Sequence, residues 1–272
     1  MNNPIAVSTL GCPDWELDRI LSAAGEYGYD AIELRGYGPT LDLPLAEPFT
    51  PANRAASHRR FSDAGIAVCC VSSSGVATQG NLEHVRAHVE LASALGCPVV
   101  RVFGGALDKE MTAADALAAA AENLRAFGDA AQAEGVKIVL ETHDSFSTGR
   151  SVADLIAAAD HPAVRSLWDL HHPFREGEPI HDTAACLNPT LGHVHVKDSI
   201  PDRGYCLLGE GDIPVYPMLE LILEARYGGA ISLEWEKRWH PEIADPEAAF
   251  PYYARGLRAF LEARAVAHDA DC

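Results

Sequence analysis

Short apolar runs alternate with longer amphipathic segments along the whole chain. The short runs are rich in Val and Ile, which is typical of strands buried on both faces of a parallel sheet. The predicted strands are Ile5–Leu10, Ala31–Arg35, Ile66–Ser72, Val99–Phe103, Lys137–Glu141, Val164–Asp169, Gly192–Val196 and Ala230–Trp235. The predicted helices are Asp14–Tyr27, Pro51–Ala64, Leu82–Leu95, Thr112–Glu134, Val152–Ala159, Ile180–Leu187, Pro214–Ala225 and Pro246–Ala263.

The ends of several predicted helices carry recognisable signals. Thr112 is followed three positions later by Asp115, the spacing of an N-terminal cap. Glycines at 28, 96 and 135 directly follow three of the predicted helices, including the one that begins at Thr112. The helix after Thr112 is the clearest, since Ala, Leu and Glu dominate it.

Eight strand–helix units over 272 residues give 272/8 = 34 residues per unit, which suits a (β/α)8 TIM barrel. No linker rich in Pro, Gly or Ser divides the chain, so a single α/β domain over residues 1–272 is predicted. Residues from about 264 onward lack an apolar stripe and are expected to form a flexible tail. An open doubly wound sheet has the same alternation, but its nucleotide-binding form needs a Gly-rich turn after the first strand, which Thr9–Pro13 lacks.

The charge balance disfavours some classes of partner. The chain has 21 Lys and Arg against 39 Asp and Glu, so 21 − 39 = −18. Such a surface repels nucleic acid and anionic lipid. Seven cysteines without a CxxC pair disfavour a disulfide framework, and reduced thiols predict a cytoplasmic protein. The first residues do not resemble a signal peptide, and no uncharged apolar run reaches about 18 residues, so no membrane partner is expected.

The last four predicted strands end in carboxylates and imidazoles. In a TIM barrel, catalytic residues lie at the C-terminal ends of the strands, and side chains two apart share a face. One group from each strand can therefore converge, and these are Glu141, Asp169, His195 and Glu234. Burying such charges without partners is costly, and a metal ion is the usual remedy. Three carboxylates and one His suit Mn²⁺, Mg²⁺ or Co²⁺, and Zn²⁺ is also compatible.

Four motifs in this order resemble those of the xylose-isomerase-like TIM-barrel superfamily, also called the sugar phosphate isomerase/epimerase family. They are Glu141–His143, Trp168–Pro173, His193–Asp198 and Gly228–Glu234, and the resemblance runs from Ser8 to Glu236. Members of the ketose 3-epimerase and inosose-processing types hold one divalent metal with Glu, Asp, His and Glu. The resemblance implies the same role for the four residues above. Its D-x-x-H motif implies that His172 contacts the substrate.

The same residues suggest a mechanism. A metal can bind a substrate carbonyl and the adjacent hydroxyl, and so stabilise the enediolate formed when a proton leaves the carbon. In related epimerases two glutamates flank the substrate, which implies that Glu141 and Glu234 are both metal ligands and the acid/base pair. The predicted function is a metal-dependent sugar or keto-polyol isomerase or epimerase of carbohydrate metabolism. Mn²⁺ is the favoured ion, and a homodimer is compatible with the fold.

Several other residues are candidates for supporting roles. Arg101 and Lys197 are predicted to orient substrate oxygens or to pair with a carboxylate, and His143 is a further substrate-binding candidate. Glu33 and Arg35 end the second strand and could assist the site or pair with each other. Glu236 shares a face with Glu234 and is a further candidate for the site, and the turn Leu208–Asp212 could help to close over it.

Other readings of the four strand ends remain open. The enolate chemistry would also serve a dehydratase acting on an inosose or a similar keto-polyol or hydroxy-keto acid. A sugar-binding barrel without catalysis would keep the same pocket, and a buried ion-pair network would need no metal. An endonuclease-IV-like nuclease shares the fold but needs a cationic DNA-facing surface, which the net charge of −18 disfavours. The substrate, free or phosphorylated, is not specified by the sequence.

Overall fold

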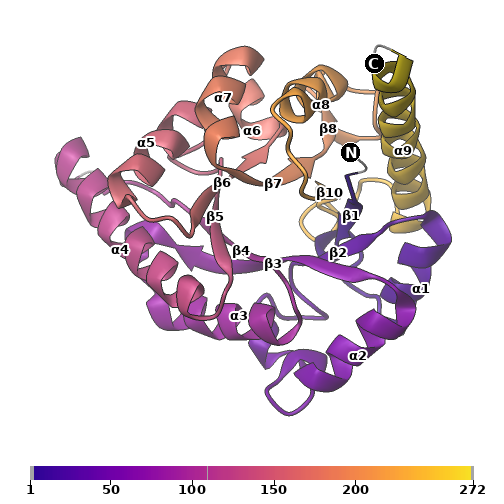
Figure 1. The fold of residues 1–272 in the computed structure, drawn as a ribbon, viewed down its shortest axis with the longest axis horizontal. Coiled ribbons are helices and arrows are strands. Elements are labelled where there is room, and N and C mark those ends of the chain that lie inside the picture. The colour runs from indigo at the N-terminus through magenta and orange to yellow at the C-terminus, as the bar shows by residue number, and fades with distance from the viewer. Residues whose placement is uncertain (1–2, 109, 271–272) are drawn as a thin grey trace.

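The computed structural model describes residues 3–108 and 110–270, in which parallel strands close into a barrel (Figure 1). The order around the barrel is β1-β10-β7-β6-β5-β4-β3-β2. Its strands are β1 Ile5–Ser8, β2 Ala31–Leu34, β3 Ala67–Val76, β4 Val99–Phe103, β5 Lys137–Glu141, β6 Val164–Asp169, β7 Leu191–Val196 and β10 Ile231–Leu233. The predicted (β/α)8 barrel is confirmed, and the open doubly wound sheet is excluded because the sheet has no edge strand.

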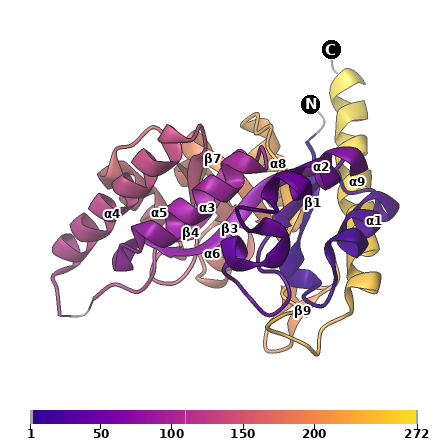
Figure 2. The same ribbon diagram turned by 90° about the horizontal axis from the view of Figure 1, so that it is seen from below.

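Helices follow the strands and cover the outside of the barrel (Figures 1 and 2). They are α1 Leu17–Tyr27, α2 Arg54–Ala64, α3 Leu82–Ala94, α4 Ala113–Ala133, α5 Gly149–Ala159, α6 His171–Arg175, α7 Ile180–Leu187, α8 Val215–Glu224 and α9 Pro246–Ala270. Within the described residues, no helix combines the length and the apolar character needed to span a membrane.

Local signals fix several of these bounds. The Thr112 hydroxyl accepts a hydrogen bond from the Asp115 amide (3.2 Å), so α4 begins where the cap predicted it. Gly28 ends α1 with φ of 83°, a left-handed conformation that glycine adopts without steric cost. Helix α9 continues to Ala270, so the stretch expected to be a flexible tail from about residue 264 is helical to that point. Residues 271–272 lie outside the described residues, and flexibility there stays a prediction.

Two elements near the mouth of the barrel were not predicted. The short helix α6 follows β6 directly, and the hairpin of β8 (Asp198–Ile200) and β9 (Gly204–Cys206) follows β7. In Figure 2 this hairpin projects from the C-terminal side of the barrel. Both elements are too short to show a helical or strand periodicity in the sequence.

The bore of the barrel changes character from one end to the other. On β5, Lys137, Val139 and Glu141 share one face, and on β6 the matching residues are Arg165, Leu167 and Asp169. Val139 and Leu167 pack with Cys70 and Val99 in an apolar cluster between the two charged ends. The N-terminal mouth of the bore therefore carries cations, and the C-terminal mouth carries carboxylates.

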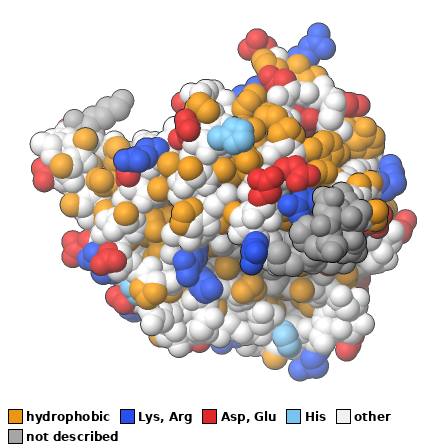
Figure 3. Space-filling view, turned by 45° about the horizontal axis from the view of Figure 1, so that its top comes forward, with side chains coloured by type: hydrophobic (Ala, Val, Ile, Leu, Met, Phe, Trp, Pro, Cys, Tyr) orange, Lys and Arg blue, Asp and Glu red, His pale blue; other side chains and the backbone are white. Residues whose placement is uncertain are grey.

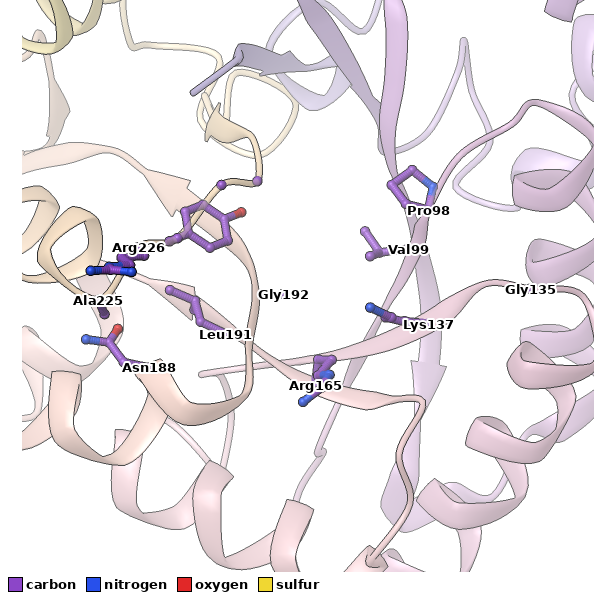
Figure 4. A pocket seen from close by; sticks show the side chains of 13 residues that line it. Pro98, Val99, Gly135, Lys137, Arg165, Asn188, Leu191, Gly192, Ala225 and Arg226 are labelled. Carbon is purple, nitrogen blue, oxygen red and sulfur yellow. The ribbon is translucent and has the colours of Figure 1, made fainter. Parts of the chain in front are cut away.

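The N-terminal mouth opens into a cavity of about 580 Å³. Figure 4 shows Lys137 and Arg165 on one side of it and Arg226 on the other. None of these three cations has an ion-pair partner within the described part of the chain, and Lys137 and Arg226 are exposed to solvent. By contrast, the molecular face shown in Figure 3 carries charges of both signs in small groups among apolar and uncharged atoms.

Candidate metal centre

The C-terminal mouth brings together the four side chains predicted to converge. Glu141, Asp169, His195 and Glu234 each offer one ligand atom, and these atoms all lie within 4.8 Å of one another. His195 Nδ1 lies 3.2 Å from Glu141 Oε1, 3.4 Å from Glu234 Oε2 and 3.9 Å from Asp169 Oδ2. All four side chains are buried. Their convergence is a feature of the structure, while metal binding itself stays a prediction.

A buried carboxylate holds the other side of the His195 ring. Both oxygens of Glu33 lie 3.0 Å from His195 Nε2, and Glu33 Oε2 lies 2.9 Å from His193 Nε2. The Ser72 hydroxyl donates to Glu33 Oε1 at 2.6 Å. Burial opposes ionisation of Glu33, but His195 and His193 outweigh it and hold the pKa of Glu33 well below its usual value. An ionised carboxylate only accepts, so His195 Nε2 carries a proton and its Nδ1 is the atom turned toward the other three groups.

Lys197 is surrounded by carboxylates, and its predicted contact with substrate stays a prediction. Its ammonium lies 2.7 Å from Asp169 Oδ2, 2.6 Å from Glu234 Oε2 and 2.6 Å from Glu236 Oε1. The Tyr205 hydroxyl donates to the same oxygen of Glu236 at 2.8 Å. Burial would lower the pKa of Lys197, but Asp169 and the two glutamates raise it well above its usual value, so the ammonium is charged. Two roles were predicted for Lys197, and the structure shows the pairing with carboxylates.

Arg101 lies on the opposite side of the group. Its Nε is 3.3 Å from Glu141 Oε2, and its guanidinium carbon lies 3.9 Å from the centre of the Phe103 ring. Burial would raise the pKa of Glu141, but Arg101 and His195 lower it to about 2 although Glu234 opposes them. Glu141 is therefore a carboxylate at neutral pH.

The four residues fit a divalent cation. Glu141 Oε2 and Asp169 Oδ2 are buried and make no hydrogen bond within the described residues, although each has a cation nearby. Burial raises the pKa of Asp169, and Lys197 offsets this only in part. Burial would lower the pKa of His195, but the carboxylates of Glu234, Glu33 and Glu141 raise it well above its usual value, so this group of acids favours positive charge at Nδ1, which a divalent ion would supply. Oxygen and imidazole donors in this ratio suit Mn²⁺, Mg²⁺, Co²⁺ or Zn²⁺.

A run of aromatic and imidazole rings forms one wall of the mouth. Neighbouring ring centres lie between 4.7 and 5.4 Å apart along the series Phe103, His143, His172, His171, Tyr205 and His240. His172 Nε2 is 3.6 Å from Asp169 Oδ2, so this predicted substrate residue stands beside the four ligand candidates. Burial and the charge of Lys197 lower the pKa of His172 to about 4, so its ring is neutral at pH 7. His143, also predicted, is half-buried in the same wall.

Two secondary candidates were the pair Glu33 and Arg35 and the turn Leu208–Asp212. Glu33 and Arg35 do not pair with each other, because Glu33 holds two histidines and the Arg35 guanidinium donates to the Ser74 hydroxyl at 3.0 Å. The turn Leu208–Asp212 wraps around the buried Asp198 carboxylate, which accepts hydrogen bonds from the Gly209 and Gly211 amides. A Cβ at Gly211 would lie 2.1 Å from Asp198 Oδ1, so the turn requires glycine there.

A separate group behind the mouth was missed in the sequence. His84 and His88 are one helical turn apart on α3, and both face Asp42 Oδ1 at 4.0 and 3.9 Å. His88 Nδ1 donates to the His84 carbonyl at 2.8 Å, and burial lowers the pKa of His88 to about 3. The spacing of four between the two histidines was the available signal, but their approach to Asp42 depends on the long loop after β2.

Comparisons with known proteins agree with this architecture. The model of a family described as xylose isomerase-like TIM barrel matches residues 21–260. A putative hydroxypyruvate isomerase from Streptomyces coelicolor is 25% identical over 265 residues, covering 88% of this chain and 90% of that protein. The structure of an L-ribulose 3-epimerase has a TM-score of 0.80 at 20% identity, covering 99% and 98% of the two chains. The IolI protein, solved with a zinc atom, has a TM-score of 0.78 at 17% identity, covering 95% and 98%.

Proposed function

Because this chain belongs to the xylose isomerase-like TIM barrel family, we propose that it is a divalent-metal-dependent isomerase or epimerase. The substrate is a small hydroxy-carbonyl compound, and the reaction moves a proton at the carbon next to its carbonyl group. The observation that carries the proposal is the buried group of Glu141, Asp169, His195 and Glu234, whose ligand atoms lie within 4.8 Å of one another.

These four residues would hold the metal, with Mn²⁺ as the favoured ion. When bound, the ion supplies a Lewis acid that polarises the substrate carbonyl and stabilises negative charge on its oxygen. Glu33 keeps the proton of His195 on Nε2, and so presents Nδ1 as a donor atom. Lys197 holds one oxygen each of Asp169 and Glu234 and so fixes their orientation.

The two glutamates are proposed to exchange the proton. Glu141 Oε2 makes no hydrogen bond in the described part of the chain, so it has a lone pair available to accept a proton from carbon. Glu234 stands across the group, and its Oε2 is held by Lys197. A base with a low pKa becomes effective only where the acidity of the carbon is raised beside it. His172, neutral and adjacent to Asp169, is placed to donate to or accept from a substrate hydroxyl.

The names of two similar proteins suggest two different reaction subtypes. The curated relative is named as a putative hydroxypyruvate isomerase, which favours an aldose–ketose type of shift in a hydroxy-keto acid. The similar solved structure is named as an L-ribulose 3-epimerase, which favours inversion at one carbon of a ketose. Both subtypes begin with the same proton removal. A dehydratase would begin in the same way and then expel a β-hydroxyl group. A cytoplasmic location and a homodimer remain predictions.

The first experiment measures bound metal per chain after loading with Mn²⁺ and removal of excess ion. The wild-type protein should hold about one ion per chain, and the Asp169→Ala variant should hold none because it loses one of four ligands. Arg165→Met, at the other end of the bore, is the matched control and should keep the ion. A wild-type protein that retains no Mn²⁺ or Co²⁺ would contradict the proposal.

The second experiment follows proton exchange with deuterated water on a panel of ketoses and hydroxy-keto acids. Glu141→Gln keeps an oxygen ligand but removes the base, so exchange should fall by about 10²–10⁴-fold. The metal content of the variant is measured in parallel. Near wild-type exchange in a variant that still holds the ion would show that Glu141 is not the base.

A further inference from the structure

Arg35 is a buried cation that makes no ion pair with any carboxylate of the described residues. Strand β2 ends at Leu34, and Arg35 follows on the face that Glu33 presents to the bore. The residue is only 6% exposed, and its side chain donates one hydrogen bond, to Ser74 Oγ at 3.0 Å. Within residues 3–108 and 110–270, no carboxylate oxygen lies within 4.0 Å of its guanidinium. Burial and the charge of Arg101 together lower the pKa of Arg35 to about 9, although the more distant carboxylates of Glu234, Glu141 and Glu33 act in the opposite direction.

The other buried cations of this mouth each have a carboxylate within 4.0 Å, although Arg101 Nε and Nη1 make no hydrogen bond in the described residues. Lys197 has three carboxylates at 2.6–2.7 Å, and Arg101 has Glu141 at 3.3 Å. Removing a charge from water without a counter-charge costs several kcal/mol. Arg35 makes no such contact within the described residues. An anionic ligand that binds at this position would supply the missing counter-charge.

Arg35 and Arg101 lie near the same aromatic ring. Their guanidinium carbons are 5.9 and 3.9 Å from the centre of the Phe103 ring. Phe103 in turn lies next to His143, at one end of the ring wall that leads to the four ligand candidates. Because Arg101 also contacts Glu141, a small molecule held by Arg35 would have its neighbouring carbons close to the proposed base.

We propose that Arg35, supported by the Ser74 hydroxyl and by the charge of Arg101, binds a carboxylate group of the substrate. The inference rests on the proposed function for the location of the reacting carbon, and it narrows the substrate to a hydroxy-keto acid rather than a neutral sugar. A planar guanidinium fork matches a carboxylate in a bidentate manner. A phosphate ester usually meets a glycine-rich turn or a helix N-terminus as well, and Arg35 is followed by an extended loop rather than by a helix.

The test compares two probes with the same three-carbon skeleton, D-glycerate and glycerol, which differ in one carboxylate. Binding to the Mn²⁺-loaded protein is measured by calorimetry. The wild type should bind D-glycerate at least tenfold more tightly than glycerol. Arg35→Met should weaken D-glycerate binding by about tenfold to hundredfold, the range for a hydrogen bond to a charged group, and should leave glycerol binding unchanged.

Three further variants protect the test against misfolding and non-specific charge effects. Arg35→Lys keeps the charge but loses the fork, so its affinity for D-glycerate should lie between those of the wild type and Arg35→Met. Ser74→Ala leaves the arginine in place and should weaken binding only a few-fold. Arg165→Met removes an arginine from the opposite end of the same bore and should bind D-glycerate as the wild type does.

Each contrary result has a defined meaning. Equal D-glycerate binding by Arg35→Met and wild type would overturn the proposal, because the carboxylate would then be held elsewhere. Arg35-dependent binding of glycerol 3-phosphate that is tighter than binding of D-glycerate would overturn the choice of a carboxylate in favour of a phosphate ester. Arg35-dependent D-glycerate binding without deuterium exchange on any hydroxy-keto acid would support the subsite and would contradict the proposed function alone.

Discussion

The two mouths of the barrel bore differ in the sign of their charges and in how those charges are stabilised. At the N-terminal mouth, Lys137, Arg165 and Arg226 surround an open cavity, and water can solvate the exposed cations. At the C-terminal mouth, the carboxylates are buried and are held by cations at distances near 3 Å. Strands β5 and β6 contribute charged residues to both ends, so the difference arises from the segments that cover each end. Charges in water need no fixed partner, whereas buried charges require one.

The loops after the strands produce this coverage. The short helix α6, the β8–β9 hairpin and the long loop after β2 all lie on the C-terminal side, and they bury the groups that the strand ends present. The segments that precede the strands are short and leave the N-terminal mouth open. Substitutions at the two mouths should therefore differ strongly in their effects.

The largest contrast is expected for the two lysines of the bore. Lys197→Met leaves buried carboxylates without their ammonium partner and should lower the free energy of unfolding by about 3–5 kcal/mol. Lys137→Met, at the exposed mouth, should change it by no more than about 0.5 kcal/mol. Urea denaturation in the presence of a chelator measures both. Similar losses in the two variants would show that burial does not separate the mouths.

A smaller effect is expected for the carboxylate behind His195. Glu33→Gln removes the anion that fixes the tautomer of the ring, so affinity for Co²⁺ or Mn²⁺ should fall by about tenfold to hundredfold. The absorption spectrum of the Co²⁺ form reports the ligand geometry independently of activity. Arg165→Met is the control from the other mouth. An unchanged spectrum and affinity in Glu33→Gln would remove Glu33 from the metal site.

The buried His88 should make the free energy of unfolding sensitive to acid. The pKa of His88 is lowered to about 3 by burial, so the folded state keeps the ring neutral while the unfolded chain binds a proton below about 6.5. The stability gained by burying the neutral ring is present above about pH 6.5 and is lost as the pH falls from about 6.5 toward 3. Between pH 7 and pH 5, His88→Gln should therefore lose less unfolding free energy than the wild type, by about 1–2 kcal/mol.

The His88 comparison needs a control for the removal of one imidazole. His181→Gln replaces an exposed histidine on α7, away from both mouths. His84 and Asp42 also face His88, so the measurement is repeated in His84→Gln to separate their titration. Parallel pH profiles for wild type and His88→Gln would contradict the assignment.

The smallest effect is expected at the N-terminal mouth itself. Replacing Lys137, Arg165 and Arg226 together by Gln should leave metal content unchanged and should alter the free energy of unfolding by less than about 1 kcal/mol, because these cations make no ion pair in the described residues. Metal analysis and urea denaturation of the triple variant check both statements. A loss of bound metal would show that the two mouths are coupled through the bore.

The regular elements were predictable because each one carries its own periodic signal. Strands β4, β5 and β6 have the predicted bounds, and in β4 and β5 a run that contains Val or Ile marks the strand. Strand β10 is shorter than predicted and stops at Leu233, although the Glu234 amide still donates to the Val196 carbonyl of β7 at 3.2 Å. The α6 helix and the β8–β9 hairpin escaped prediction because elements of three to five residues hold no complete hydrophobic period.

The group of Glu141, Asp169, His195 and Glu234 was predictable once the barrel itself had been predicted. Glu141, Asp169, His195 and Glu234 stand at the ends of parallel strands, and barrel topology alone brings those ends to one mouth. The partners of these groups were not predictable in detail. Glu33 is distant from His195 in the sequence, and the choice between pairing with Arg35 and pairing with His195 depends on side-chain direction.

The sequence by itself determined the barrel, the chemistry of its C-terminal mouth and the face on which each strand residue lies, because these follow from local periodicity and from the order of the strands. The tertiary structure alone decided which charges are paired. It gave Lys197 three carboxylates, turned Glu33 toward two histidines and left Arg35 buried with no carboxylate of the described residues within 4.0 Å. Pairing depends on distances of a few ångströms between strands and loops that are far apart in the chain, and no periodicity in the sequence encodes those distances.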